Sequence, residues 1–124
     1  MNIVDSSGWL EFFADGPNAG AFAPVIQKTE ELAVPAISLY EVFKKVLQER
    51  GESEALVAAA LMQQGAVIDL DATLAISAAK IAADAKLPMA DAIMLATARA
   101  LGATLWTQDA DFAEIHGVRY VPAR

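Results

Sequence analysis

Short apolar runs alternate with longer segments of helical periodicity along the whole chain, and this alternation constrains the fold more than any other feature. The segments that we interpret as strands are Asn2–Val4, Glu31–Val34, Ala66–Leu70, Ala103–Thr107 and Val118–Val121. The segments that we interpret as helices are a run through Phe13 that Ser6 or Ser7 caps, Ala19–Thr29, Ser38–Glu49, Glu52–Gln64, Asp71–Ala85 and Met89–Leu101. Strands that alternate with helices form a parallel sheet with helices packed against it. We therefore predict an α/β fold with a mostly parallel central sheet.

Composition limits both the size and the location of the protein. The 124 residues suffice for one domain, and no repeat or linker divides them. The chain has no cysteine, which excludes disulfides and thiolate metal sites. No apolar run reaches the roughly 20 residues of a membrane span, and the N-terminus lacks the basic segment of a signal peptide. We expect a soluble, cytoplasmic protein without membrane contact.

The chain is acidic, with a net charge of −7. This charge disfavours indiscriminate nucleic-acid binding, which depends on neutralising phosphates. It does not disfavour a site that holds divalent cations, because bound ions make an acidic pocket electrophilic. An acidic surface also suits a basic protein partner.

Several acids follow predicted strands or begin predicted helices. Asp5 directly follows the first strand, while Glu41 and Asp91 lie near the starts of two helices. Asp109 and Asp111 directly follow the fourth strand. In open α/β sheets, ligands bind beyond the carboxyl ends of the strands. These acids, although far apart in sequence, are therefore expected to converge at one edge of the sheet.

Each of these acids, taken alone, also has an ordinary structural explanation. Asp5 suits the cap of the helix that follows it. The run from Ser38 to Glu41 matches a capping box, in which Glu41 bonds back to the Ser38 backbone, and taken alone this is the stronger explanation. Asp91 complements a helix dipole, although its apolar neighbours place it half inside the core, where it needs a partner or a metal. The two acids after the fourth strand fit turn and cap positions.

The coincidence of these acids carries more weight than any one of them. Four carboxylates at one edge repel each other unless a cation holds them. Hard oxygen ligands favour Mg²⁺ or Mn²⁺ over zinc, and such sites act on phosphates. Other site types are absent from the sequence, because there is no glycine-rich phosphate loop and the single histidine, His116, lies in a predicted turn without a second ligand.

Four segments together resemble the PIN-domain nucleases. They are Ile3–Ser7, Ser38–Val42, Leu87–Ala92 and Leu105–Phe112. Their order and the chain length resemble the VapC toxins of type II toxin–antitoxin pairs, and the resemblance covers essentially the whole chain. It implies a single PIN domain over residues 1–124, folded as a three-layer α/β/α sandwich. It also implies RNA cleavage that depends on Mg²⁺ or Mn²⁺.

The resemblance assigns roles to particular residues. Those that match the family's catalytic and metal-binding quartet are Asp5, Glu41, Asp91 and Asp109. Those that match supporting positions are Thr107, Asp111 and Ser6 or Ser7, with the hydroxyl groups orienting a carboxylate or a water. The resemblance further implies a cognate VapB-like antitoxin, whose C-terminal tail lies over the active site, and a homodimer.

We predict a toxin that hydrolyses RNA phosphodiesters, leaves 3′-hydroxyl and 5′-phosphate ends, and inhibits translation. Lys44 and Lys45 follow Glu41 on one helix and are candidates for contacts with the RNA backbone, although a solvated helix face explains them equally well. One alternative is a non-catalytic PIN-fold module that binds RNA or protein. A second alternative is a receiver-like, magnesium-binding signalling domain. Domains of that class have two adjacent acids after the first strand and a lysine after one of the last strands. Here Asp5 stands alone, and no lysine follows Ala103–Thr107.

Overall fold

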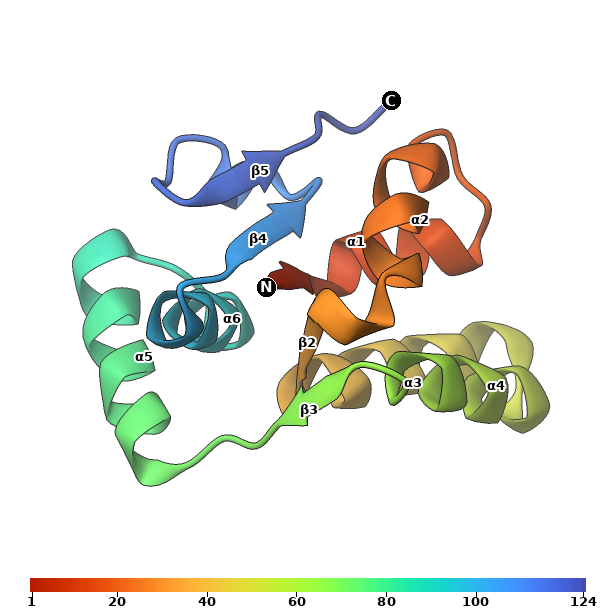
Figure 1. Cartoon of the computed structure of the whole chain (residues 1–124), viewed down its shortest axis with the longest axis horizontal. Helices are drawn as coiled ribbons and strands as arrows, with labels where there is room; N and C mark the ends of the chain where they lie inside the picture. Colours follow the sequence, from red (N-terminus) through yellow and green to blue (C-terminus); the bar gives the residue numbers. More distant parts are fainter.

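A five-stranded sheet forms the centre of the computed structural model, which describes residues 1–124 (Figure 1). Its strands are β1 (Asn2–Val4), β2 (Leu32–Pro35), β3 (Ala66–Ile68), β4 (Thr104–Thr107) and β5 (Val118–Tyr120). Their order in the sheet is β3-β2-β1-β4-β5, and every neighbouring pair is parallel. The predicted α/β class is confirmed, with a sheet that is parallel throughout.

Helices cover both faces of this sheet. They are α1 (Ser6–Phe13), α2 (Ala19–Gln27), α3 (Ala36–Arg50), α4 (Glu52–Met62), α5 (Ala72–Ala85) and α6 (Met89–Leu101), with short 3-10 turns η1 (Thr29–Glu31) and η2 (Ala110–Phe112). Helices α5 and α6 lie on one face, and α1 to α4 lie on the other (Figure 1). This is the three-layer α/β/α arrangement implied by the sequence. None of the helices combines the length and apolar character that crossing a membrane requires.

Alternating side chains of the strands divide the core into two halves. Ile3 and Leu105 belong to the half that α5 and α6 cover, while Val4 and Val34 belong to the half beneath α1 to α4. Successive residues of a strand point to opposite faces. Because both faces are covered, β1 and β2 are apolar throughout their buried parts instead of alternating with polar residues.

The start of α3 differs from the sequence prediction. The helix begins at Ala36, directly after Pro35, whose φ of −59° and missing N–H suit the position before a first turn. Ser38 therefore lies inside the helix, where its hydroxyl is buried and donates to the Pro35 carbonyl oxygen at 2.7 Å. The capping-box explanation that fits Glu41 taken alone is therefore wrong. The Glu41 side chain therefore makes no capping hydrogen bond at the start of α3.

The order of the strands places β1 and β4 side by side at the centre. From β1 the chain continues to β2 and β3 on one side, and it returns to β4 and β5 on the other side. The carboxyl ends of β1 and β4 thus form the topological switch point, where open α/β sheets bind their ligands. Asp5 follows β1 at this point, and its backbone N–H donates to the Trp106 carbonyl oxygen of β4 at 3.0 Å.

Candidate active site

Asp5 is the buried carboxylate of the site and also the cap of α1. Its Oδ1 accepts hydrogen bonds from the backbone N–H of Gly8 at 3.0 Å and from the Ser7 hydroxyl at 2.7 Å. Its Oδ2 accepts from the Thr107 hydroxyl at 2.6 Å. Burial raises the pKa of Asp5, the bonds from Thr107, Ser7 and Gly8 lower it, and the charge of Asp109 raises it, with a net increase. Asp5, rather than Ser6 or Ser7, is thus the residue that caps α1. Its Oδ2 accepts only one hydrogen bond, so a second lone pair of that oxygen is available to another donor or a cation.

Thr107, the last residue of β4, joins the ends of the two central strands. Its hydroxyl is fully buried, donates to Asp5 and accepts from the backbone N–H of Asp109 at 2.9 Å. The Ser7 hydroxyl lies 3.4 Å from it and accepts from the backbone N–H of Gln108 at 3.3 Å. These hydroxyls orient the Asp5 carboxylate and fix the backbone that carries Asp109.

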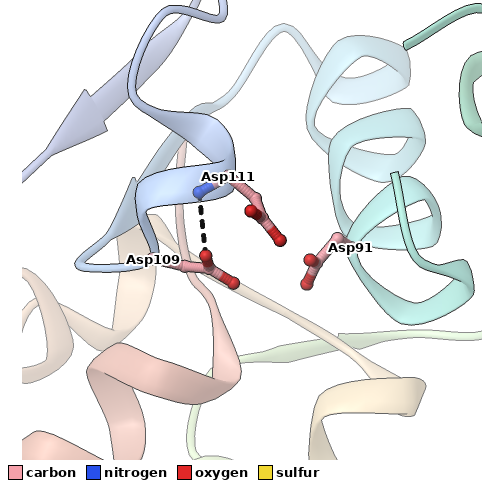
Figure 2. Close-up of side chains that lie close together, drawn as sticks. All are labelled: Asp91, Asp109 and Asp111. Atoms are coloured by element: carbon pink, nitrogen blue, oxygen red, sulfur yellow. Dashed lines mark hydrogen bonds between the residues drawn. The ribbon is translucent and has the colours of Figure 1, made fainter. Parts of the chain in front are cut away.

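Three further carboxylates converge beside this network, as Figure 2 shows. One oxygen from each of Asp91, Asp109 and Asp111 lies within 4.8 Å of the other two. Asp91 comes from the first turn of α6, while Asp109 caps η2 and accepts from the Asp111 backbone N–H at 2.9 Å. Asp91 and Asp109 are half-buried, and Asp111 is exposed. Asp111, predicted only as a supporting residue, thus belongs to the same tight cluster as Asp91 and Asp109.

The electrostatics of the cluster are centred on Asp91. The pKa of Asp91 is raised to about 7. Burial is the largest cause of this increase, followed by the negative charges of Asp109, Asp5, Glu41 and Asp111. The charges of the other three acids of the predicted quartet therefore all act on Asp91, although Asp5 and Glu41 lie outside the tight group of three. Each added negative charge disfavours the ionised form of Asp91.

Glu41 projects from the second turn of α3 toward α1. Its Oε1 accepts a 2.6 Å hydrogen bond from the Ser6 hydroxyl, across 35 positions of the sequence. The two serines at the start of α1 thus have separate partners, with Ser6 bonded to Glu41 and Ser7 bonded to Asp5. The sequence indicated that Ser6 or Ser7 would orient a carboxylate, and in the structure Ser7 contacts Asp5 while Ser6 contacts Glu41.

No basic side chain balances these acids. The ion pairs of the structure are Lys45–Glu49, Arg50–Glu54 and Lys80–Asp84, all within helices and away from the cluster. Converging carboxylates that lack a protein cation require protons or a metal ion to offset their repulsion. The donors are all hard oxygens, the ligands that Mg²⁺ and Mn²⁺ prefer. The residues present therefore fit a divalent metal ion.

The two lysines predicted to contact RNA lie on the exposed side of α3. Lys45 pairs with Glu49 at 3.1 Å, as residues of a solvated helix face do. The Lys44 ammonium lies 5.8 Å from the ring centroid of Tyr40, which is itself 61% exposed. Neither lysine pairs with an acid of the cluster.

A groove of about 350 Å³ extends from the site between α1 and α3. It is lined by polar groups from three parts of the chain, including Ser7, Gln108, Lys45 and Arg50. Sequence reasoning did not single out Gln108, although its place directly before Asp109 was a signal that it lies at the site. It also missed the buried Asn18, which contacts Gln108 and which no sequence pattern marks.

A model of the PIN domain family matches residues 3–118 of the chain. The chain belongs to the PIN domain family. Membership excludes the receiver-like alternative, as does the strand order, because flavodoxin-like sheets have the order 2-1-3-4-5. No curated protein matches the sequence significantly.

Solved structures share the PIN fold with this chain. A toxin–antitoxin complex from Klebsiella pneumoniae matches with a TM-score of 0.80 and 23% identity, over 96% of this chain and 96% of that one. VapC20 of Mycobacterium tuberculosis, described as a sarcin-ricin loop cleaving toxin, matches with a TM-score of 0.78 and 22% identity, over 100% and 99%. A DNA-bound VapBC complex from Salmonella typhimurium matches with a TM-score of 0.73 and 18% identity, over 98% of each chain. At these identities the likeness shows the PIN fold alone.

Proposed function

We propose that this PIN-family chain is a metal-dependent ribonuclease and the toxin of a VapBC-type toxin–antitoxin pair. The observation that carries the proposal is the convergence of Asp91, Asp109 and Asp111 within 4.8 Å, with no basic side chain to balance them. The cluster lies beside Asp5 at the switch point of the sheet, where α/β proteins bind ligands. We take residues 1–124 as one PIN domain.

The proposed metal ligands are the predicted quartet together with Asp111. Asp91, Asp109 and Asp111 offer oxygens that one ion is able to share, while Asp5 offers the free lone pair of Oδ2. A bound Mg²⁺ or Mn²⁺ supplies the positive charge that offsets the charge of a phosphodiester and lowers the pKa of a water. Glu41 completes the acidic set, and Ser6 holds its carboxylate in place.

Hydrolysis by water, rather than attack by the RNA 2′-hydroxyl, yields 3′-hydroxyl and 5′-phosphate ends. The Glu41 carboxylate, which is fixed on one oxygen by Ser6, keeps its other oxygen available to orient the attacking water. The Thr107 hydroxyl holds the Asp5 carboxylate in place. Lys44 and Lys45, which are exposed near Glu41 on α3, are the proposed contacts for the RNA backbone.

The partners that we propose follow from the family and from the proteins that share the fold. A toxin–antitoxin complex and a DNA-bound VapBC complex are among these proteins. We propose a VapB-like antitoxin for this chain, a homodimer, and a cytoplasmic location where RNA is accessible. Inhibition of translation by RNA cleavage is the proposed cellular effect.

The deciding experiment is an RNA cleavage assay with wild type, Asp91→Asn and Asp69→Asn. Asp69 is exposed and lies outside the cluster, so Asp69→Asn controls for the loss of one negative charge. We expect Mg²⁺- or Mn²⁺-dependent cleavage by wild type and Asp69→Asn, inhibition by EDTA, and loss of at least about a hundredfold in Asp91→Asn. A wild type that cleaves no RNA in a broad panel contradicts the nuclease and supports the non-catalytic alternative.

A second experiment tests the toxin role separately from the chemistry. Expression of wild type in bacteria is expected to arrest growth, while expression of Asp91→Asn is not. Co-expression of a small protein encoded beside the gene is expected to restore growth. Cleavage in vitro without growth arrest contradicts the toxin role and leaves the nuclease intact.

A further inference from the structure

Gln108 lies beside the acidic cluster and makes a side-chain contact with a buried residue. It lies between Thr107 and Asp109 in the sequence, and its side chain lines the groove between α1 and α3. The Oε1 of Gln108 accepts a 3.0 Å hydrogen bond from the Nδ2 of Asn18. Asn18 lies 90 positions earlier in the chain and is only 2% exposed.

The orientation of the Asn18 amide follows from its second partner. The same Nδ2 donates to the carbonyl oxygen of Pro122 at 2.9 Å. A carbonyl oxygen only accepts hydrogen bonds, so the NH₂ group of Asn18, and not its oxygen, faces Pro122. The other N–H of that group then requires an acceptor, and Gln108 supplies one only through its Oε1. The amide of Gln108 is therefore fixed with its oxygen toward Asn18 and its own NH₂ group turned away.

The NH₂ group of Gln108 has no partner within the protein. It makes no side-chain hydrogen bond, since the contacts of Gln108 are through Oε1 and the backbone N–H. The Trp9 indole N–H is the one buried side-chain donor without a partner, so the NH₂ group of Gln108 reaches solvent. Two N–H donors of fixed direction thus project from a residue adjacent to Asp109.

We propose that Gln108 presents this NH₂ group as a neutral donor to a hydrogen-bond acceptor of the RNA strand, and that Asn18 is the positioning residue that directs it. The proposal rests on the proposed nuclease function and names a substrate contact of the same site. A lysine or arginine at this position would pair with Asp109 or Asp111 and compete with a metal ion. A neutral amide attracts the RNA without engaging those carboxylates. Because Asn18 orders the amide before RNA arrives, little side-chain entropy is lost on binding.

The matched test replaces Gln108 with glutamate. In Gln108→Glu one carboxylate oxygen still accepts from Asn18, so the buried contact survives, while the donor that faces the RNA becomes an anionic acceptor. We expect KM for RNA to rise roughly tenfold or more, kcat to stay within about twofold, and the thermal unfolding midpoint to stay unchanged. Gln64→Glu makes the same charge change at an exposed residue outside the site and is expected to leave KM unchanged. A Gln108→Glu protein with wild-type KM overturns the proposal.

The role of Asn18 is separated from a merely structural one by a double-mutant cycle. Asn18→Ala frees the Gln108 amide, so KM is expected to rise about as much as in Gln108→Ala, and the double variant is expected to show no further rise. If Asn18→Ala instead raises KM equally in the wild-type and Gln108→Ala backgrounds, Asn18 does not act through Gln108 and its positioning role is overturned. The Gln108 variants leave the buried Asn18 in place, so the proposal is testable even if Asn18→Ala fails to fold.

The acceptor on the RNA is either a phosphate oxygen or a base edge, and substrate variants distinguish them. If it is a phosphate oxygen, Gln108→Ala raises KM equally for all sequences, and one methylphosphonate near the cleavage site abolishes the difference between the proteins. If it is a base edge, Gln108→Ala changes the preferred base beside the cleavage site. Equal KM for wild type and Gln108→Ala on every substrate overturns this proposal alone, whereas a wild type that cleaves no RNA overturns it together with the proposed function.

Discussion

Thr107 donates a 2.6 Å hydrogen bond to Asp5 across 102 positions of the sequence. This bond joins the carboxyl ends of β1 and β4, the two strands that meet at the switch point of the sheet. The same hydroxyl accepts from the Asp109 backbone, so one buried oxygen connects two acids of the site. The geometry of the acidic edge is therefore set from inside the protein, by a hydroxyl that is fully buried.

Removing the Thr107 hydroxyl is expected to destabilise the protein. Thr107→Val keeps the shape of the side chain but removes the donor to Oδ2 of buried Asp5 and leaves the Asp109 N–H without an acceptor. We expect a loss of about 1–3 kcal/mol in the free energy of unfolding, measured by urea denaturation. Thr107→Ser is expected to recover most of it, and Thr73→Val on the exposed side of α5 serves as the control. Equal stability of Thr107→Val and wild type would show that the bond contributes nothing.

The metal-free protein is expected to lose stability as pH rises. In the unfolded chain Asp91 has an ordinary pKa of about 4, while burial first and the neighbouring carboxylates second raise the pKa of Asp91 to about 7 in the folded protein. A pKa raised by folding contributes stability that is fully present below about pH 4 and is lost as pH rises through about 7. After allowing for solvent screening of a half-exposed group, the protein is expected to be roughly 1–2 kcal/mol less stable at pH 8 than at pH 5.

Urea denaturation in EDTA at the two pH values measures this effect. Asp91→Asn removes the titrating group, so the difference between pH 5 and pH 8 is expected to shrink and stability at pH 8 to increase. Asp84→Asn, at an exposed position of α5, is expected to keep the wild-type difference. An unchanged pH dependence in Asp91→Asn would assign the effect to another group.

Asp111 is expected to contribute to metal affinity as strongly as Asp109. Their carboxylate oxygens lie in the same cluster with Asp91, so either substitution to asparagine removes one charge from the proposed metal site. We expect each of Asp109→Asn and Asp111→Asn to weaken Mn²⁺ binding roughly tenfold or more, measured by calorimetry at pH 8. Asp69→Asn is the control. If Asp111→Asn binds Mn²⁺ with wild-type affinity, Asp111 is not a metal ligand.

The Ser6 hydroxyl is expected to matter for turnover rather than for metal binding. Ser6→Ala removes the bond that holds Glu41, a residue outside the tight group of three acids. We expect kcat for RNA cleavage to fall roughly tenfold because Glu41 is less well oriented, with Mn²⁺ affinity close to that of wild type. Ser77→Ala, on the exposed side of α5, is expected to change neither. A parallel loss of metal affinity in Ser6→Ala would place Glu41 among the main ligands instead.

The parts of the fold that sequence predicts best are those determined by local chemistry. Asp71 caps α5 through the Leu74 N–H, and Gly102 ends α6 with a φ of 62°, and both residue types are typical of those positions. The alternation of strands and helices was sufficient for the α/β class. The capping-box pattern places the start of α3 at Ser38, whereas Pro35 is the residue before the first turn and the helix begins at Ala36.

Contacts between distant side chains were beyond sequence reasoning. The convergence of acids at one edge was predictable because parallel strands share a direction, but the pairing of Ser6 with Glu41 depends on how α1 and α3 pack. The half-buried Glu11 carboxylate accepts the Asn18 N–H at 2.7 Å, a contact that no local pattern indicates. The Asn18–Gln108 contact depends on a loop and a strand end that no periodicity relates.

The double use of Asp5 has a consequence for how this chain can change over generations. Replacing Asp5 removes the cap of α1 and leaves three buried or half-buried donors without an acceptor. A substitution at this position therefore destabilises the folded protein. Replacing Asp91 relieves repulsion and carries no such penalty. A descendant that abandoned nuclease activity is therefore expected to keep Asp5 and to lose Asp91 or Asp111 first, so an intact aspartate after β1 is a poor sign of activity in related chains.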